Sequence, residues 1–356
     1  MYMIICGHFI YQGIRHVTSG EIPDVGFEES TMGMVNYGLL QLVGYLVNIG
    51  SNLFVMISGY FLIKPRPFSY ALKKGFKLWY TIVFYNILIY AVLIALSAGA
   101  GWNTFSLPTK GWSWGEAFAP IYSSSYWFMT MYMGILLLSP FLSRMAQALT
   151  KKEYQILLLV LLIMNFGQEQ LGYGKVYSSN ILLYILVFLI GGYVSLHKPQ
   201  GRWLKYTWGG YFVVCLLLAP ASVAKQLFLH PASCPQIHGL AYNSIPLCTS
   251  ICFFLWVANM NNVKSKISVF AIKTGPYILA VYLIHENKLI RPLLWDKLIR
   301  PTDHIGDWYL VPYMFAVSLA ILLLCIAIDY LRTLCFAKIG SVVREKAHLL
   351  SKPETR

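Results

Sequence analysis

Three ionisable side chains lie within apolar stretches of the chain, at His8, His285 and Glu286. An ionisable group inside a bilayer is costly, so each is a candidate for function. Imidazole titrates near neutral pH, which suits His8 to act as a general base. The alternatives are a structural histidine bonded to a neighbouring helix for His8, and a membrane-interface position for His285 and Glu286. Tyr282, three residues before His285, is expected on the same helix face, whereas His285 and Glu286, being adjacent, are not expected to face each other on a helix.

A second set of polar residues lies near the ends of two other apolar stretches. Lys74 and Lys77 are three residues apart and could together bind a phosphate group, or could simply be cytoplasmic positive charges. Asn52 and Ser58 lie in an apolar stretch, where amide and hydroxyl groups most often link helices. These residues are candidates for substrate or donor binding.

The sequence does not predict a metal centre. His230, Cys234 and His238 have ligand chemistry, but Pro231 and Pro235 interrupt the regular helix that would present them together. The seven cysteines include no C-x-x-C pair, and most lie in apolar stretches. A phosphate-binding P-loop and a dinucleotide-binding glycine fingerprint are also missing from the sequence.

The composition indicates which elements must position these side chains. Apolar residues make up 57% of the 356 residues, and charged residues only 12%, about half of the roughly 25% in soluble domains. These values predict an all-α integral membrane protein, because a bilayer core needs about 20 apolar residues per helix. We expect about ten transmembrane helices, over residues 1–13, 38–63, 76–98, 125–142, 154–168, 179–196, 206–224, 242–260, 274–290 and 309–331.

The charges predict the orientation of these helices. The chain has 28 Lys and Arg against 14 Asp and Glu, and most of the basic residues fall in alternate connecting segments and in the C-terminal tail. Because basic residues collect on the cytoplasmic side, both termini are expected in the cytoplasm. The net charge of +14 is therefore explained by topology, and we expect no nucleic-acid partner.

Four stretches, in this order, resemble the acyltransferase-3 family of membrane acyltransferases. They cover most of the chain, and each is similar to a family motif. The first contains His8, the second runs from Asn52 to Ile63, the third from Tyr126 to Leu142 and the fourth from Val281 to Arg291. Their sequences are MYMIICGHFIYQG, NLFVMISGYFLI, YWFMTMYMGILLLSPFL and VYLIHENKLIR.

The resemblance implies a fold of about ten helices and transfer of an acyl group, usually acetyl, from acyl-coenzyme A to a hydroxyl of a glycan. It implies that His8 is the catalytic histidine. Lys74 and Lys77 stand where the family often has a basic pair, which would bind the coenzyme A phosphates. The remaining candidates would line or orient the acceptor, or shape the substrate tunnel; they are Tyr282, His285, Glu286, Trp127 and Tyr132.

The chain departs from the family pattern in two places. The family usually has a basic residue eleven positions before the histidine, which here falls before residue 1. The first apolar stretch is also short, so we expect the chain to begin within the first helix. The second departure is Asn52, which stands where the family commonly has Asp, and Glu286 could supply the missing carboxylate.

We expect one membrane domain over residues 1–340 and a short basic cytoplasmic tail over 341–356. The predicted function is O-acetyl transfer from acetyl-CoA to a cell-surface or lipid-linked glycan, in the bacterial plasma membrane and without a metal. The alternative is a transporter or flippase for a lipid-linked sugar or a small solute, which would account equally well for ten spans.

Overall fold

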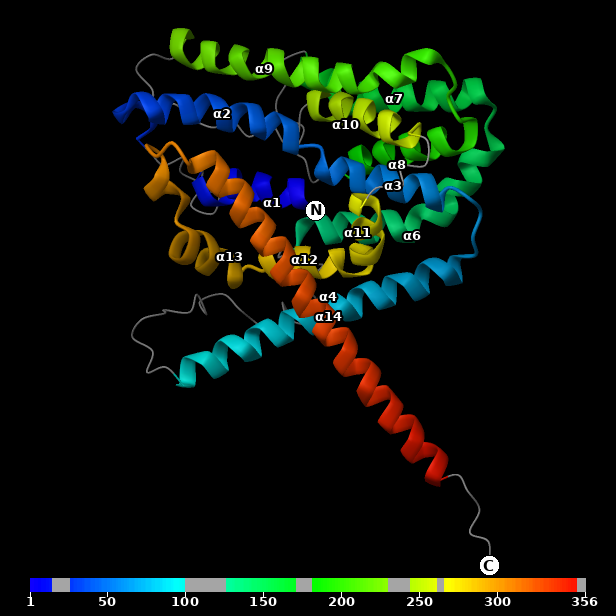
Figure 1. The fold of residues 1–356 in the computed structure, drawn as a ribbon. Coiled ribbons are helices and arrows are strands. Elements are labelled where there is room, and N and C mark those ends of the chain that lie inside the picture. Colours follow the sequence, from blue (N-terminus) through cyan, green and yellow to red (C-terminus); the bar gives the residue numbers. More distant parts are fainter. Residues whose placement is uncertain (15–25, 100–125, 171–180, 230–243, 261–265, 351–356) are drawn as a thin grey trace, which may run out of the picture.

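The computed structural model describes residues 1–14, 26–99, 126–170, 181–229, 244–260 and 266–350 (Figure 1). Every regular element in these residues is a helix, and none of them forms a strand. The α-helices are α1 (Tyr2–His8), α2 (Thr31–Val47), α3 (Gly50–Leu62), α4 (Phe68–Gly99), α6 (Trp127–Ala148), α7 (Lys151–Gln170), α8 (Ile181–His197), α9 (Thr207–Leu229), α10 (Ser244–Ala258), α11 (Lys266–Thr274), α12 (Ile278–His285), α13 (Ile290–Pro292) and α14 (Leu310–Leu350).

Six helical segments of the described residues are long and apolar enough to cross a membrane. They are Thr31–Leu62, Phe68–Leu96, Trp127–Ala148, Arg202–Ala221, Ser268–His285 and Leu310–Lys338. Two further apolar helices, Ile181–His197 and Ile245–Ala258, are shorter. The multi-span, all-helical prediction is confirmed, whereas the expected number of ten spans and the location of the termini stay predictions.

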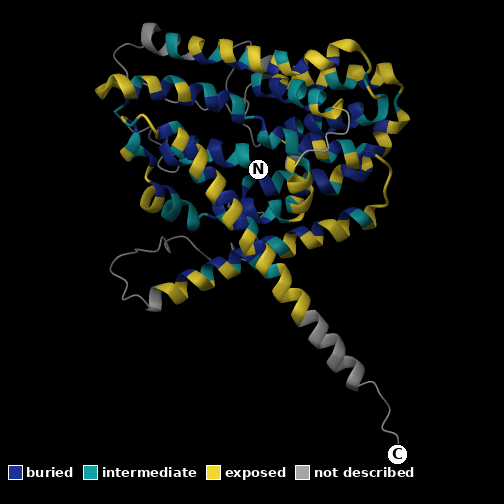
Figure 2. Cartoon of the chain, in the orientation of Figure 1, coloured by how far each residue is buried: buried dark blue, intermediate teal, exposed yellow. Residues whose placement is uncertain are grey.

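Exposed residues run along the outer helices of the bundle (Figure 2), and many of them are large and apolar. Phe61, Leu217 and Leu324 are 65%, 65% and 63% exposed. Soluble proteins rarely expose apolar surface continuously along their helices. A surface of this kind is suited to contact with lipid tails.

One expected span is two helices. The stretch predicted at 38–63 begins earlier, at the N-cap Ser30, whose Oγ accepts a hydrogen bond of 2.9 Å from the backbone of Gly33. It is interrupted between α2 and α3, where α1 packs closely against the chain. A Cβ atom at Gly50 would lie 2.5 Å from Ile4 Cγ1, so this approach requires glycine.

Helices α3 and α8 pack with their backbones almost in contact. A Cβ at Gly59 would lie 2.0 Å from the Phe188 carbonyl oxygen, and one at Gly191 would lie 2.0 Å from the Met56 carbonyl oxygen. Small residues at such crossings allow close helix packing in membranes. Gly59 therefore fixes the position of α3, and with it the neighbouring Ser58.

A hydrogen bond to a buried carboxylate links α4 to α14, and the same carboxylate forms an ion pair within α14. Tyr85 donates a hydrogen bond to Asp329, and Arg332 Nε donates to the same carboxylate at 2.5 Å. Asp329 is 3% exposed, and a buried charge is tolerated when it is paired and hydrogen-bonded. These contacts tie the two helices together where they cross (Figure 1).

Two apolar cores meet along α12. Tyr282 and Leu283 belong to a core shared with α3, α6 and α8, whereas Val281 belongs to a core shared with α1, α2 and α14. The C-terminal end of α12 therefore lies where the two halves of the bundle join. It is at this junction that the polar residues of α1 and α12 come together.

Candidate active site

His8 is the last residue of α1, and a wider π-helical segment (η1, Phe9–Ile14) follows it. Phe9 anchors this turn, because its ring packs edge-on against Trp295 and Tyr313, with ring centroids 6.0 Å apart in both cases. The side chain of His8 is 19% exposed. The imidazole is thus held by packed neighbours and still accessible.

His285 and Glu286 both face His8. His8 Nδ1 lies 2.9 Å from His285 Nε2 and 3.0 Å from Glu286 Oε1. The two adjacent side chains need not face each other for this, because each makes its own contact with the His8 imidazole. Glu286 is the C-cap, with φ −92° and ψ −1°, and its backbone N–H still bonds to the Tyr282 carbonyl oxygen at 3.1 Å.

The hydrogen bonds define which ring nitrogens carry protons. His285 Nδ1 lies 2.5 Å from the Val281 carbonyl oxygen, which can only accept, so this nitrogen carries the proton in the neutral ring. His285 Nε2 is then an acceptor. His8 Nδ1 faces this acceptor and the Glu286 carboxylate, so it carries the proton of the neutral His8 ring. The Nε2 atom of His8 keeps its lone pair, as a general base requires.

The carboxylate of Glu286 is buried, with 4% of its side chain exposed. Its Oε2 atom lies 3.6 Å from Arg291 Nη1, while Oε1 faces His8. Oε1 has no hydrogen-bond partner among the described residues, so opposite charge is what compensates the burial of this carboxylate. Glu286 is therefore placed to stabilise positive charge that develops on His8.

A row of aromatic rings extends from His285 toward α3; we call Tyr282, Phe128 and Tyr132 the aromatic row. The Tyr282 ring lies 6.2 Å from that of His285 and 5.8 Å from that of Phe128, and Phe128 stacks on Tyr132 at 6.3 Å. At its far end, Ser58 Oγ lies 3.2 Å from Tyr132 Oη. The predicted site residues Tyr282, Tyr132 and Ser58 are thus connected to His8 through neighbouring rings.

Two other predicted residues contact other helices. Asn52 Nδ2 donates to Ser250 Oγ at 3.3 Å and so links α3 to α10, as expected of an interhelical amide. Trp127 packs against Tyr184, with ring centroids 6.4 Å apart.

The two predicted lysines lie in the first turns of α4, and both are exposed. Lys74 Nζ lies 4.9 Å from the centre of the Tyr70 ring, which Arg66 also approaches, at 4.5 Å. The structure thus gathers Arg66, Tyr70, Lys74 and Lys77 at one end of α4. Arg66 and Tyr70 were not predicted as part of this basic group.

His8, His285 and Glu286 are also the one set of His, Cys, Asp and Glu, among the described residues, with ligand atoms close enough to hold a metal ion. These atoms lie within 4.8 Å of one another. A divalent ion there would have to replace the proton on His8 Nδ1 and would lie beside the Arg291 guanidinium. The charges therefore suit proton transfer better than metal binding. The His230, Cys234 and His238 set lies outside the described residues.

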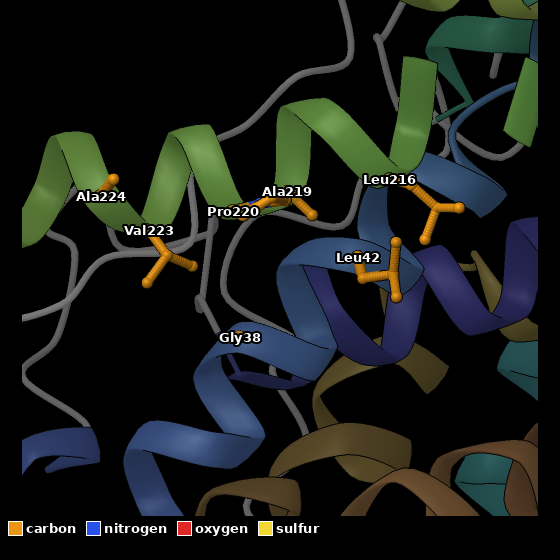
Figure 3. A pocket seen from close by; sticks show the side chains of 7 residues that line it. All are labelled: Gly38, Leu42, Leu216, Ala219, Pro220, Val223 and Ala224. Atoms are coloured by element: carbon orange, nitrogen blue, oxygen red, sulfur yellow. The ribbon is translucent and has the colours of Figure 1, made fainter. Parts of the chain in front are cut away.

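An apolar groove of about 500 Å³ lies between α2 and α9 (Figure 3). Gly38 and Leu42 line it from α2, and Leu216, Pro220 and Val223 line it from α9. These side chains offer no acid, base or nucleophile. The groove therefore has no part in the chemistry that we assign to His8.

Three residues of the site region were not predicted as part of it: Arg291, Asn287 and Tyr126. Arg291 pairs with Glu286, and Asn287 donates hydrogen bonds to Tyr126 Oη at 2.7 Å and to Asn86 Oδ1 at 3.0 Å. The sequence signal was the polar run His285-Glu286-Asn287 in an apolar stretch. Consecutive polar residues there indicate a helix end with backbone groups to satisfy.

A comparison of the sequence with known families identifies the family of the chain. Residues 1–330 match the sequence model of the acyltransferase-3 family, described as an acyltransferase domain. Neither the curated proteins nor the solved structures gave a significant match to the chain. The matched region includes His8, His285, Glu286 and the aromatic row. The chain therefore belongs to the acyltransferase-3 family of membrane acyltransferases.

Proposed function

We propose that the protein transfers an acetyl group from acetyl-CoA to a hydroxyl group of a cell-surface or lipid-linked glycan, with His8 as the general base. The observation that carries this proposal is the contact of His8 Nδ1 with both His285 Nε2 and Glu286 Oε1, at 2.9 and 3.0 Å. Membership of the acyltransferase-3 family supports the reaction class. The acetyl donor and the glycan acceptor are parts of the proposal.

In this reaction His8 Nε2 accepts the proton of the acceptor hydroxyl as its oxygen attacks the thioester carbonyl. The new C–O bond forms, the C–S bond breaks, and the proton passes from His8 to the departing coenzyme A sulfur. Glu286 stabilises the imidazolium that exists between these two proton transfers. His285 accepts from His8 Nδ1 and keeps the ring in the productive orientation.

The two substrates are assigned to different ends of the bundle. Lys74 and Lys77 are exposed at the start of α4, and a cytoplasmic pair of this kind would bind the coenzyme A phosphates. The aromatic row runs from Ser58 on α3 toward His285, with Trp127 beside it, and would enclose the acyl chain or the sugar. The expected location is the bacterial plasma membrane, where a cytoplasmic donor and an envelope acceptor are both within reach.

The test is acyl transfer by the full chain in membrane vesicles supplied with radiolabelled acetyl-CoA. We expect His8→Ala to abolish label incorporation into the glycan fraction while the protein still inserts into the membrane. His197→Ala is the matched control, because this histidine packs against Tyr154 and Tyr193, away from His8. Full incorporation by His8→Ala would overturn the assignment of the base.

A further inference from the structure

Asn287 lies at the break between α12 and α13, directly after the two residues that face His8. Its side chain is fully buried, with 0% exposed. A buried amide is stable only if its polar atoms are hydrogen-bonded. The partners that Asn287 uses therefore show what it holds in place.

The amide of Asn287 uses both its donor protons and its oxygen. Nδ2 donates to Asn86 Oδ1 on α4 at 3.0 Å and to Tyr126 Oη, next to α6, at 2.7 Å. Oδ1 accepts from the backbone N–H of Leu289 at 2.9 Å. Tyr126 Oη in turn donates to the carbonyl oxygen of Leu283, on α12, at 2.9 Å.

These bonds fix the chain on both sides of Glu286. On one side, Tyr126 holds the last turn of α12 through Leu283. On the other, the Asn287 carbonyl accepts from the backbone N–H of Arg291 at 2.8 Å, and Arg291 pairs with Glu286. Glu286 is therefore held between two points, and its carboxylate is aimed at His8 without any bond from Asn287 to His8 itself.

We infer that Asn287 is a positioning residue for the reaction, which uses its bonds to Asn86 and Tyr126 to hold Glu286 against His8. The inference rests on the proposed function of His8 and Glu286. It goes further, because the placement of Glu286 against His8 then depends on a residue that contacts neither His8 nor the aromatic row. The simpler reading is that Asn287 only links helices, as buried amides often do in membrane proteins.

The two readings differ in what a substitution does to the rate. If Asn287 acts through Glu286, Asn287→Ala lets the carboxylate move relative to His8, and a misplacement of about 1 Å costs about 100-fold in rate. The KM for acetyl-CoA should change little, because the donor is assigned to the end of α4. If Asn287 only links helices, loss of folded protein should account for the whole effect.

The experiment is a double-mutant cycle between Asn287→Ala and Glu286→Gln, measured as kcat per folded protein in detergent micelles. We expect Asn287→Ala to lower kcat about 100-fold in the wild-type background and less than about threefold in Glu286→Gln, because residues that act as a unit are not additive. Asn36→Ala is the matched control. This buried amide also makes two bonds, each of 2.8 Å, to the carbonyl oxygens of Ile305 and Asp307, and its loss should leave kcat unchanged.

An equal loss of kcat in both backgrounds would overturn the positioning role and leave the role of Glu286 intact. A Glu286→Gln single variant with unchanged kcat would overturn both the positioning role of Asn287 and the catalytic role of Glu286. If Asn287→Ala does not fold, Tyr126→Phe decides the question, because it removes one partner of the amide and keeps the ring. We expect about a tenfold loss of kcat in Tyr126→Phe, and no further loss when Glu286→Gln is already present.

Discussion

Glu286→Gln removes the negative charge beside His8 while keeping the size of the side chain. At the observed 3.0 Å between Glu286 Oε1 and His8 Nδ1, a carboxylate and an imidazolium attract by about 5 kcal/mol at an effective dielectric constant of about 20. Arg291, 3.6 Å from the other carboxylate oxygen, already neutralises part of this charge. We therefore take roughly half of the attraction, about 3 kcal/mol, as the loss in transition-state stabilisation, which lowers kcat about 100-fold.

The assay is the initial rate of acyl transfer from labelled acetyl-CoA by the purified full chain in proteoliposomes. The KM for acetyl-CoA should stay within about twofold, because the charge acts on the transition state and not on donor binding. Glu153→Gln is the control, since Glu153 is exposed at the start of α7 and bonds only Thr150 in the described structure. A Glu286→Gln variant with more than half of the wild-type kcat would refute the role of this carboxylate.

Three further predictions concern the donor site and the fold. Lys74→Ala with Lys77→Ala should raise the KM for acetyl-CoA about tenfold with little change in kcat, since lost charge-assisted bonds to phosphate weaken binding; an unchanged KM would place the donor elsewhere. Gly59→Ala should reduce the free energy of unfolding by about 1–3 kcal/mol, because its Cβ would lie 2.0 Å from a backbone carbonyl oxygen of α8. The thermal unfolding midpoint in detergent should therefore fall, and an unchanged midpoint would contradict this packing. Asp329→Asn should destabilise the fold by about 1 kcal/mol, because it weakens the hydrogen bond from Tyr85 and removes the carboxylate that pairs with Arg332, itself 28% exposed; an unchanged melting temperature would show that these contacts contribute nothing.

Much of the fold was predictable because lipid imposes a simple rule on sequence. A bilayer requires continuous apolar helices, so the spans at the positions of α4, α6 and α14 could be read directly from composition. The break between α2 and α3 was missed because no proline or charge marks it. It depends on the approach of α1 to Gly50, a contact between segments distant in sequence.

The candidate site could be predicted only in part. His8, His285 and Glu286 were identified because ionisable residues are rare in apolar stretches. Their convergence could not be predicted, because it depends on the contact of α1 with the end of α12, two segments that lie far apart in the sequence. Asn287 was missed for the same reason, since its partners lie on α4 and next to α6.

The central claim is that this chain acylates a glycan through His8. The most direct test is mass spectrometry of the surface glycans of cells that carry the chain, lack it, or carry only His8→Ala. We expect the acetyl mass to disappear from the sugar units on deletion, to return with the wild-type chain and not to return with His8→Ala. Unchanged acetylation together with an altered amount or length of glycan would rule out acylation through His8 and favour transport of a lipid-linked sugar.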